Sequence, residues 1–247
     1  MLEKLTALVD ARRYDSWTAL AARYAAVEKS KVIDVELCPS EGPVRMGEVV
    51  AKVAEVSGNR ALVITDVGQN QLMAARYSGF CEKRSFISSG GLGTMGFGLP
   101  AAIGAKIAGP DREVCLFVGD GGIQMTMQEF GTLMQENLPV KIVLLNNNWL
   151  GNVRQFQELL FGRRYSQTRM VNPDYGLIAQ AYGIKYIHVE EREELDAAVR
   201  AMFAADGPVL LDVHVLELGM VYPMIPSGKR ADEIMLNSEE WFDDGKC

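Results

Sequence analysis

The chain alternates between short, continuous apolar runs and amphipathic helical patterns. The apolar runs, which indicate strands, cover residues 61–68, 115–120, 140–147, 185–190 and 208–215. Helical spacing of apolar residues occurs at 44–58, 97–108, 125–138, 173–183 and 192–205. Runs that are apolar throughout are typical of strands covered on both faces, and their alternation with helices is typical of parallel sheets. The pattern predicts an α/β fold, a three-layer doubly wound parallel sheet with helices on both faces.

The two ends of the chain follow different patterns. Residues 1–30 contain no Gly or Pro and predict one or two amphipathic helices, and a break containing Pro and Gly follows at 38–43. From Gly219 onward the periodicity is lost. We therefore divide the chain into a helical segment or linker at 1–40, a domain at 41–218, and a tail at 219–247. We expect this tail to pack on or near the active site.

Composition and charge exclude several classes of protein. With 25 Lys and Arg against 32 Asp and Glu, the net charge is −7, which argues against nucleic-acid and membrane-surface partners. One phosphate-bearing small molecule is still compatible, because helix N-termini hold phosphate without a basic surface. The N-terminus carries acids and no continuous apolar stretch, so we expect neither a signal peptide nor a membrane span. These features predict a cytoplasmic protein.

The cysteines and histidines give little sign of a metal site. The four cysteines lie far apart without CxxC spacing, and His188 and His214 are isolated in apolar, strand-like surroundings. We therefore expect no thiolate or imidazole metal site, and we expect the thiols to be reduced and mostly buried.

Polar residues end three of the predicted strands. Residues 66–70 follow the first strand, Gly119-Asp120-Gly121-Gly122 the second, and Asn146-Asn147-Asn148 the third. In open parallel sheets, ligands bind beyond the carboxyl ends of the strands, so all three groups should face one edge. Residues 122–145, a gap of 24, leave room for one helix and one strand between the Asp and Asn groups. The second and third strand ends should therefore be neighbours.

The chemistry at these strand ends suggests a cation. Asp120 lies between glycines and opens a helix, so the free backbone N–H groups there could bind an anion next to the Asp120 carboxylate. The two negative charges would repel each other unless a cation lies between them. Mg²⁺ suits this position, because it binds carboxylate, amide and phosphate oxygens together. Asn146 and Asn147 supply amide oxygens suited to the same ion. Alternatively, Asp120 caps a helix and the asparagines form a turn. The Gly-rich stretch at 90–106 matches a dinucleotide fingerprint poorly, because only the weak strand candidate RSFISS precedes it.

The arrangement GDG, 24 residues and NN resembles the thiamine diphosphate-binding motif. The segments TDVGQNQ, SGGLGTMGFGLPAAIGAK, LPVKIVLLNNNWLGNV, RYSQT, NPDYGLIAQAYGI and YPMIPSGK resemble the C-terminal cofactor domain of acetolactate synthase, also called acetohydroxyacid synthase. The resemblance covers residues 42–230, and the opening helical segment looks like a remnant of the family's preceding domain.

The resemblance implies a role for each matching residue. Asp120, the Asn147 side chain and the main-chain oxygen of Trp149 would bind Mg²⁺. The residues that would line the diphosphate are Val67, Gly68, Gln69, Asn70, Gly121, Gly122, Gly151 and Asn152, and Gly119 would also bind the cofactor. Gly93 and Met95 would contact the aminopyrimidine, and Val153 and Phe156 the acceptor substrate. The implied reaction, a step in branched-chain amino acid biosynthesis, decarboxylates pyruvate and joins the product to a second 2-oxo acid.

Two residues depart from the family's pattern. Asn70 stands where the family usually has His, and Phe156 where it has Trp. The Trp position is associated with the choice of acceptor, so the preference between pyruvate and 2-oxobutyrate stays open. Phe156 could equally be a core aromatic residue on a helix.

The resemblance also implies parts that 247 residues do not accommodate. The family has a pyrimidine-binding domain, whose glutamate activates the cofactor, and a middle domain that holds FAD. We therefore expect a fragment or a split-gene product, inactive alone, whose partners are a pyrimidine-binding domain, further copies of itself and a regulatory subunit. The alternatives are another thiamine diphosphate-dependent decarboxylase or carboligase, a non-catalytic partner subunit, and a nucleotide- or flavin-binding module.

Overall fold

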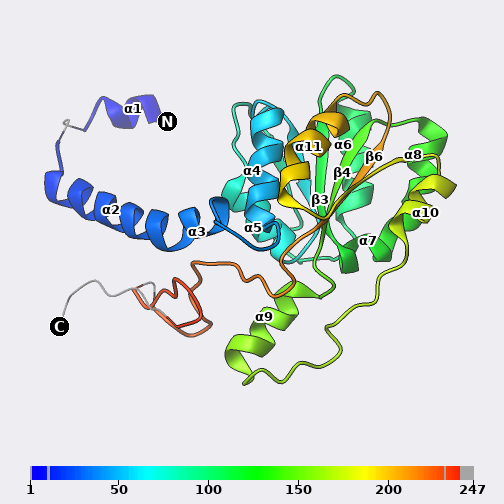
Figure 1. Ribbon diagram of the computed structural model, residues 1–247. Helices are drawn as coiled ribbons and strands as arrows, with labels where there is room; N and C mark the ends of the chain where they lie inside the picture. The colour runs from blue at the N-terminus through cyan, green and yellow to red at the C-terminus, as the bar shows by residue number, and fades with distance from the viewer. Residues whose placement is uncertain (1, 10–11, 231, 240–247) are drawn as a thin grey trace. The chain divides into compact units, whose positions relative to one another are not determined.

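The computed structural model describes residues 2–9, 12–230 and 232–239 (Figure 1). The chain divides into two compact units, one formed by Met1–Val35 with Tyr222–Cys247 and the other by Glu36–Val221. The boundaries of the larger unit thus lie a few residues outside the 41–218 domain proposed from the sequence. No helix in the described ranges is long and apolar enough to cross a membrane.

The smaller unit contains helices and one isolated strand bridge. Its helical elements are α1 (Leu2–Thr6), α2 (Asp15–Glu28), a π-helical turn (Lys29–Ile33) and the start of α3 (Asp34–Leu37). The backbones of Met224 and Met235 form an antiparallel bridge with N···O distances of 3.0 and 2.8 Å.

The larger unit is built on one parallel sheet, which confirms the predicted fold class. Its strands, in spatial order, are β2 (Phe86–Ile87), β1 (Leu62–Thr65), β3 (Val114–Gly119), β4 (Val140–Asn146), β6 (Val209–His214) and β5 (Lys185–Val189). All neighbouring pairs are parallel. The weak strand candidate at RSFISS is the short edge strand β2. Because β3 and β4 are adjacent, the predicted proximity of their ends is confirmed.

Helices cover both faces of this sheet (Figure 1). One face packs against α4 (Met46–Val56), α5 (Gln69–Tyr77) and α11 (Leu195–Phe203), which follows a 3₁₀ turn at Arg192–Glu194. The other face packs against α6 (Gly98–Ala108), α7 (Asp120–Thr126), α8 (Phe130–Glu136) and α10 (Tyr175–Ala181). The helix predicted at 125–138 is interrupted by a 3₁₀ turn at Met127–Glu129. A further helix, α9 (Gly151–Leu160), follows β4.

The strands divide their side chains between two apolar cores. In β3, Cys115 and Phe117 face the core on the α4 side, whereas Leu116 and Val118 face the core on the α6 side. This two-residue alternation explains why the strands read as continuous apolar runs. The prediction that the thiols are mostly buried is wrong for the described cysteines, because Cys38 and Cys81 are exposed.

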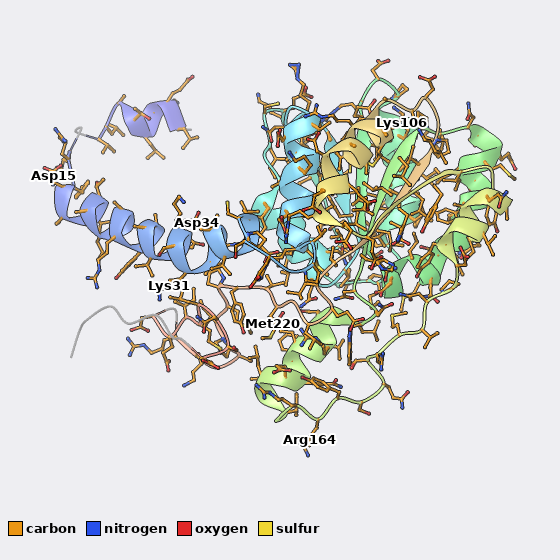
Figure 2. All side chains as sticks on the ribbon, viewed as in Figure 1. Asp15, Lys31, Asp34, Lys106, Arg164 and Met220 are labelled. Carbon is orange, nitrogen blue, oxygen red and sulfur yellow. The ribbon has the colours of Figure 1, made fainter. Side chains whose placement is uncertain are left out.

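At the amino edge of the sheet, two lysine side chains donate hydrogen bonds to backbone carbonyl oxygens. The Nζ of Lys106, at the end of α6, donates to the carbonyl oxygens of Pro110 (2.8 Å) and Arg112 (2.7 Å). Figure 2 shows Lys106 at the opposite end of this unit from Arg164, which lies in the loop after α9. Burial lowers the pKa of Lys141, near the start of β4, whose Nζ donates to the Gly207 carbonyl at 3.0 Å. The opposite, carboxyl edge carries the candidate site.

Candidate functional site

A cleft lies where β1, β3 and β4 end. It is lined by Met46, Val67, Gly68, Gln69, Asn70, Met95, Gly119, Asp120, Gly121, Gly122, Leu145, Asn147, Trp149, Leu150, Gly151, Asn152 and Val153. The lining therefore combines the three polar strand ends predicted from the sequence with the first turns of α5, α7 and α9. Such a concave site at the carboxyl edge is where open α/β sheets bind ligands.

Most of the residues predicted for the site line this cleft, and three do not. Gly93 lies outside the lining, although a Cβ built on it would come within 3.9 Å of the Val67 side chain. Phe156 lies one helical turn beyond Val153 and is 41% exposed, so the alternative that it is a core aromatic residue is wrong. Asn146 also lies outside the lining, because its side chain is directed to Asp212 and Asn172.

Asp120 is a buried carboxylate at the floor of the cleft. It follows β3 directly and is 1% exposed. Its Oδ1 accepts from the Gly121 N–H at 3.0 Å, and its Oδ2 accepts from Asn172 Nδ2 at 3.0 Å. Burial raises the pKa of the Asp120 carboxyl, although these hydrogen bonds act in the opposite direction, and no described cationic side chain contributes. A carboxylate in this position would be stabilised by a bound cation.

Asn172 holds this carboxylate in place, and sequence reasoning missed it. Its Nδ2 donates to Asp120 Oδ2 (3.0 Å), Asn146 Oδ1 (2.9 Å) and Asn148 Oδ1 (3.1 Å). Its Oδ1 accepts from Gln124 Nε2 at 3.1 Å. One amide thus joins the ends of β3 and β4. The only local signal is the Asn-Pro pair before α10, which indicates a turn and no contact with Asp120.

Asn147 projects into the cleft from the end of β4. Its Oδ1 accepts from the Trp149 N–H at 3.1 Å, and its Nδ2 donates to Gln69 Oε1 at 3.3 Å. Gln69 in turn donates from Nε2 to Gln155 Oε1 (3.0 Å) and to the Gly219 carbonyl (2.9 Å). Because an amide oxygen has two lone pairs, Asn147 Oδ1 keeps one for a cation. The Gln69 side chain is occupied in holding Asn147 and α9.

Asp66 fixes the segment that carries Met95, and this role was also missed. The residue follows β1 and is fully buried. Its Oδ1 accepts from the Gly96 N–H at 3.1 Å, and its Oδ2 accepts from the Gly98 N–H at 2.8 Å. Charge-assisted hydrogen bonds of this kind are stronger than neutral ones. They place Met95 against the cleft just before α6 begins.

Two glycines let neighbouring elements approach closely around the cleft, and a third adopts a positive φ there. A Cβ on Gly151 would lie 2.2 Å from Gln69 Oε1, and one on Gly122 would lie 2.4 Å from Asp66 Oδ1. Gly68, with φ +119°, adopts a backbone conformation that L side chains rarely take. A side chain at Gly151 or Gly122 would displace polar groups that shape the cleft, and one at Gly68 would strain the backbone.

The cleft suits an anion held together with a hard cation. The helices α5 and α9 both start at its wall, and the first N–H groups of a helix have no intrahelical acceptor and attract phosphate. Asn70 Oδ1 and Trp149 Nε1 are buried and have no hydrogen-bond partner in the described part of the chain. The carboxylate and amide oxygens of Asp120 and Asn147 are the ligand types that Mg²⁺ prefers. These residues therefore fit a magnesium-bound phosphate ester.

The segment after β6 is hydrogen-bonded to α9. The Arg154 guanidinium donates to the Gly219 carbonyl at 2.7 Å, and the Gln155 amide exchanges hydrogen bonds of 2.9 and 3.1 Å with the Val221 backbone. Met220, labelled in Figure 2, lies between these two attachment points in the sequence. The start of the predicted tail thus contacts the helix that lines the cleft.

The prediction that His188 and His214 are isolated is wrong. Their ring centroids lie 4.8 Å apart, outside the cleft lining. The reason is strand pairing: β5 and β6 are neighbours in the sheet, with His188 opposite Asp212. The sequence alone does not show that β5 and β6 pair, or that this pairing brings His188 close to His214.

A family model and three known relatives each match more than half of this chain. A family model described as thiamine pyrophosphate enzyme, C-terminal TPP binding domain, matches residues 66–213. The chain is 46% identical over 175 residues to the acetolactate synthase isozyme 2 large subunit of Escherichia coli (strain K12), which covers 70% of this chain and 32% of that protein. It is 44% identical over 186 residues to the mitochondrial acetolactate synthase catalytic subunit of Saccharomyces cerevisiae, covering 75% and 27%. With the acetolactate synthase large subunit of Haemophilus influenzae the identity is 37% over 243 residues, covering 97% and 42%. The chain thus spans between 27% and 42% of the length of these three relatives.

Proposed function

Since the chain belongs to the thiamine pyrophosphate enzymes, of which it carries the C-terminal TPP binding domain, we propose that the cleft holds the diphosphate of thiamine diphosphate through Mg²⁺. The observation that carries this proposal is the burial of Asp120, which is 1% exposed and has no cationic partner among the described side chains. A divalent ion between this carboxylate and a diphosphate would offset both charges.

Different residues around Asp120 would bind the Mg²⁺ ion and the diphosphate. Asp120 and the amide oxygen of Asn147 would hold the ion together with the main-chain oxygen of Trp149, the assignment that the family resemblance implies. The first turns of α5 and α9, at Gln69 and Gly151, would hold the diphosphate oxygens through their backbone N–H groups. Asn172 orients the Asp120 carboxylate, since it donates to Oδ2.

The other wall of the cleft would orient the organic part of the cofactor. Asp66 holds the backbone of Gly96 and Gly98, and so places Met95 against the cleft. We assign Met95 and the nearby Gly93 to the aminopyrimidine. When bound, the cofactor supplies an electron sink for decarboxylation of a 2-oxo acid and for formation of a carbon–carbon bond.

For the complete reaction we propose acetolactate synthesis, the activity named for the relatives, with decarboxylation of pyruvate and ligation to a second 2-oxo acid. The cofactor must then also meet a pyrimidine-binding domain, supplied by the same or another polypeptide. Apolar side chains near the cleft suit such a partner or the acceptor substrate: Leu92 is 94% exposed and Val153 is 46% exposed. We propose FAD only for an assembly that includes the family's middle domain, and we propose self-association of that assembly.

Calorimetric titration with thiamine diphosphate tests the cation assignment. We expect wild-type binding to require Mg²⁺, and Asp120→Ala to abolish the Mg²⁺-dependent component. Asp111→Asn is the matched control, because Asp111 is an exposed acid on the loop before β3, at the other edge of the sheet. Binding that is unchanged in Asp120→Ala, or that never needs Mg²⁺, would overturn the assignment.

A separate assay tests the reaction. Acetolactate formation from pyruvate is measured with the 247-residue chain alone and with an added pyrimidine-binding domain. We expect turnover only when that domain is present. Steady turnover by the chain alone would refute the need for a partner, and its absence in a complete assembly that binds the cofactor would refute the substrate assignment.

A further inference from the structure

Both histidines of the chain converge on one glutamate outside the cofactor cleft. The chain contains two histidines in total. His214 Nδ1 lies 2.8 Å from Glu190 Oε2, and His188 Nε2 lies 3.3 Å from the same oxygen. The two imidazole rings are nearly perpendicular, at 86°. Three potential metal ligands therefore point at one small volume, within 4.8 Å of one another.

The sheet itself creates this cluster. His188 pairs with Asp212 and Val189 with Val213 in the parallel β5–β6 register. Because side chains alternate along a strand, His188 and Glu190 share a face with Asp212 and His214. Both imidazoles are accessible, with the His188 side chain 41% and the His214 side chain 39% exposed. The three groups are thus fixed by backbone pairing and reachable by an ion from solvent.

We propose that His188, Glu190 and His214 form a second metal site, which binds a divalent transition ion such as Zn²⁺. Four ligands placed ~2.0–2.2 Å from a tetrahedral ion lie roughly 3.3–3.6 Å from one another. The observed N···O separations of 2.8 and 3.3 Å require a small expansion to accept the ion, and since the ligand atoms spread over as much as 4.8 Å, side-chain rotation must bring the set together. Water completes the coordination, as in sites with three protein ligands.

The surroundings of His188 support a ligand role. Its Nδ1 faces the Tyr186 hydroxyl at 3.4 Å and Asp212 Oδ2 at 4.0 Å, while Tyr186 donates to the same Asp212 oxygen at 2.9 Å. A ligating imidazole commonly directs its other nitrogen to a carboxylate or another polar group, which orients the ring and raises its basicity. Asp212 is buried, 3% exposed, so it holds a fixed position behind the ring. This arrangement leaves Nε2 directed at the metal position.

The two metal sites differ in ligand chemistry. The cluster offers two imidazole nitrogens and one carboxylate, a set that favours Zn²⁺, Cu²⁺ or Ni²⁺ over Mg²⁺. The cleft offers a carboxylate and amide oxygens, a set that favours Mg²⁺. Each site can therefore be filled without displacing the ion proposed for the other.

Calorimetric titration of the whole chain with Zn²⁺ tests the proposal. The titration is run in saturating Mg²⁺ after alkylation of the thiols, since Cys38 and Cys81 are exposed and would bind zinc. We expect one equivalent to bind, and we expect His188→Ala, His214→Ala and Glu190→Gln each to weaken binding at least ~10-fold. The matched control, Glu193→Gln, removes an exposed carboxylate three residues from Glu190 and should bind as the wild type does.

Proton NMR of the wild-type chain gives a readout that needs no variant. Because the chain has two histidines, both imidazole signals report on the cluster. Zn²⁺ should shift both signals and Mg²⁺ neither. Asp120→Ala should leave zinc binding unchanged, which separates this site from the cofactor cleft. Absence of saturable binding, zinc-induced shifts of neither imidazole, or wild-type affinity in the two histidine variants would overturn the proposal.

Discussion

Replacing Gly151 by alanine is the most direct test of how the cleft is built. The added Cβ would lie 2.2 Å from Gln69 Oε1 and 2.8 Å from Asn147 Nδ2. These contacts are too short to persist, so the Gln69 side chain must move. Gln69 connects Asn147 at the end of β4 with Gln155 on α9, and the substitution therefore breaks the polar contacts between these elements.

The expected loss of stability follows from those contacts. Three hydrogen bonds meet at the Gln69 amide: from Asn147 Nδ2, to Gln155 Oε1 and to the Gly219 carbonyl. At about 0.5–1.5 kcal/mol net for each, their loss lowers the free energy of unfolding by about 1.5–4.5 kcal/mol. Alanine recovers about 0.4–1 kcal/mol by restricting the unfolded chain. The net destabilisation is about 0.5–4 kcal/mol. Each kcal/mol lowers the melting temperature by about 2–4 °C for a chain of this size.

The measurement is urea unfolding followed by circular dichroism, with Gly104→Ala as the matched control. Gly104 lies on α6, is exposed, and has nothing within 4 Å of a built Cβ. The same chemical change should stabilise the chain there by about 0.5–1 kcal/mol, because glycine is unfavourable inside a helix. If Gly151→Ala is as stable as the wild type, the described packing of Gln69 against α9 is incorrect.

Three further predictions test individual polar groups. Asp66→Asn should destabilise the chain by about 1–3 kcal/mol, because an amide NH₂ would then face the N–H of Gly96 or Gly98. Hydrogen exchange at these two amides should accelerate. Unchanged exchange would contradict the role of Asp66. Asp120→Asn should remove the pH dependence of stability that this carboxyl gives to the metal-free chain. Burial raises the folded-state pKa of Asp120 above its unfolded value, so the stability that the carboxyl contributes is present at low pH and is lost as the pH rises through the folded pKa. The stability of the variant relative to the wild type, measured by urea unfolding in EDTA, should therefore be higher at pH 7 than below the ordinary pKa of a carboxyl. An equal difference at both pH values would be inconsistent with this cause. Burial also raises the pKa of the Cys115 thiol, so this thiol should react with a disulfide reagent only after unfolding, and rapid labelling in the native state would show that β3 is accessible.

Much of the sheet could be predicted from the sequence. The apolar runs at 115–120 and 140–147 correspond to β3 and β4, and the spacing of one helix and one strand between Asp120 and the asparagines implies the neighbouring ends that the structure shows. These features are local, because a strand buried on both faces must be apolar at each position. The helix α5 was missed, since its residues Gln69–Tyr77 include several polar side chains and follow the strand without a break.

The site was predictable in its residues but not in its hydrogen bonds. The triple asparagine reads as one polar group in the sequence, yet Asn147 lines the cleft while Asn146 and Asn148 bind Asn172. A repeated residue carries no information about which side chain a twisting strand end directs into a cleft. Likewise, nothing near Asp66 in the sequence indicates that its partners are the amides of Gly96 and Gly98.

The sequence by itself determined the parallel α/β architecture and the acid–amide pair at one edge of the sheet, because apolar periodicity and motif spacing act over a few neighbouring residues. Only the tertiary structure decided that Asn172 holds Asp120 and that His188 meets His214. Those contacts join residues 52 and 26 positions apart. They depend on strand order and register, which arise when the whole sheet packs its two cores and most buried polar groups find a partner.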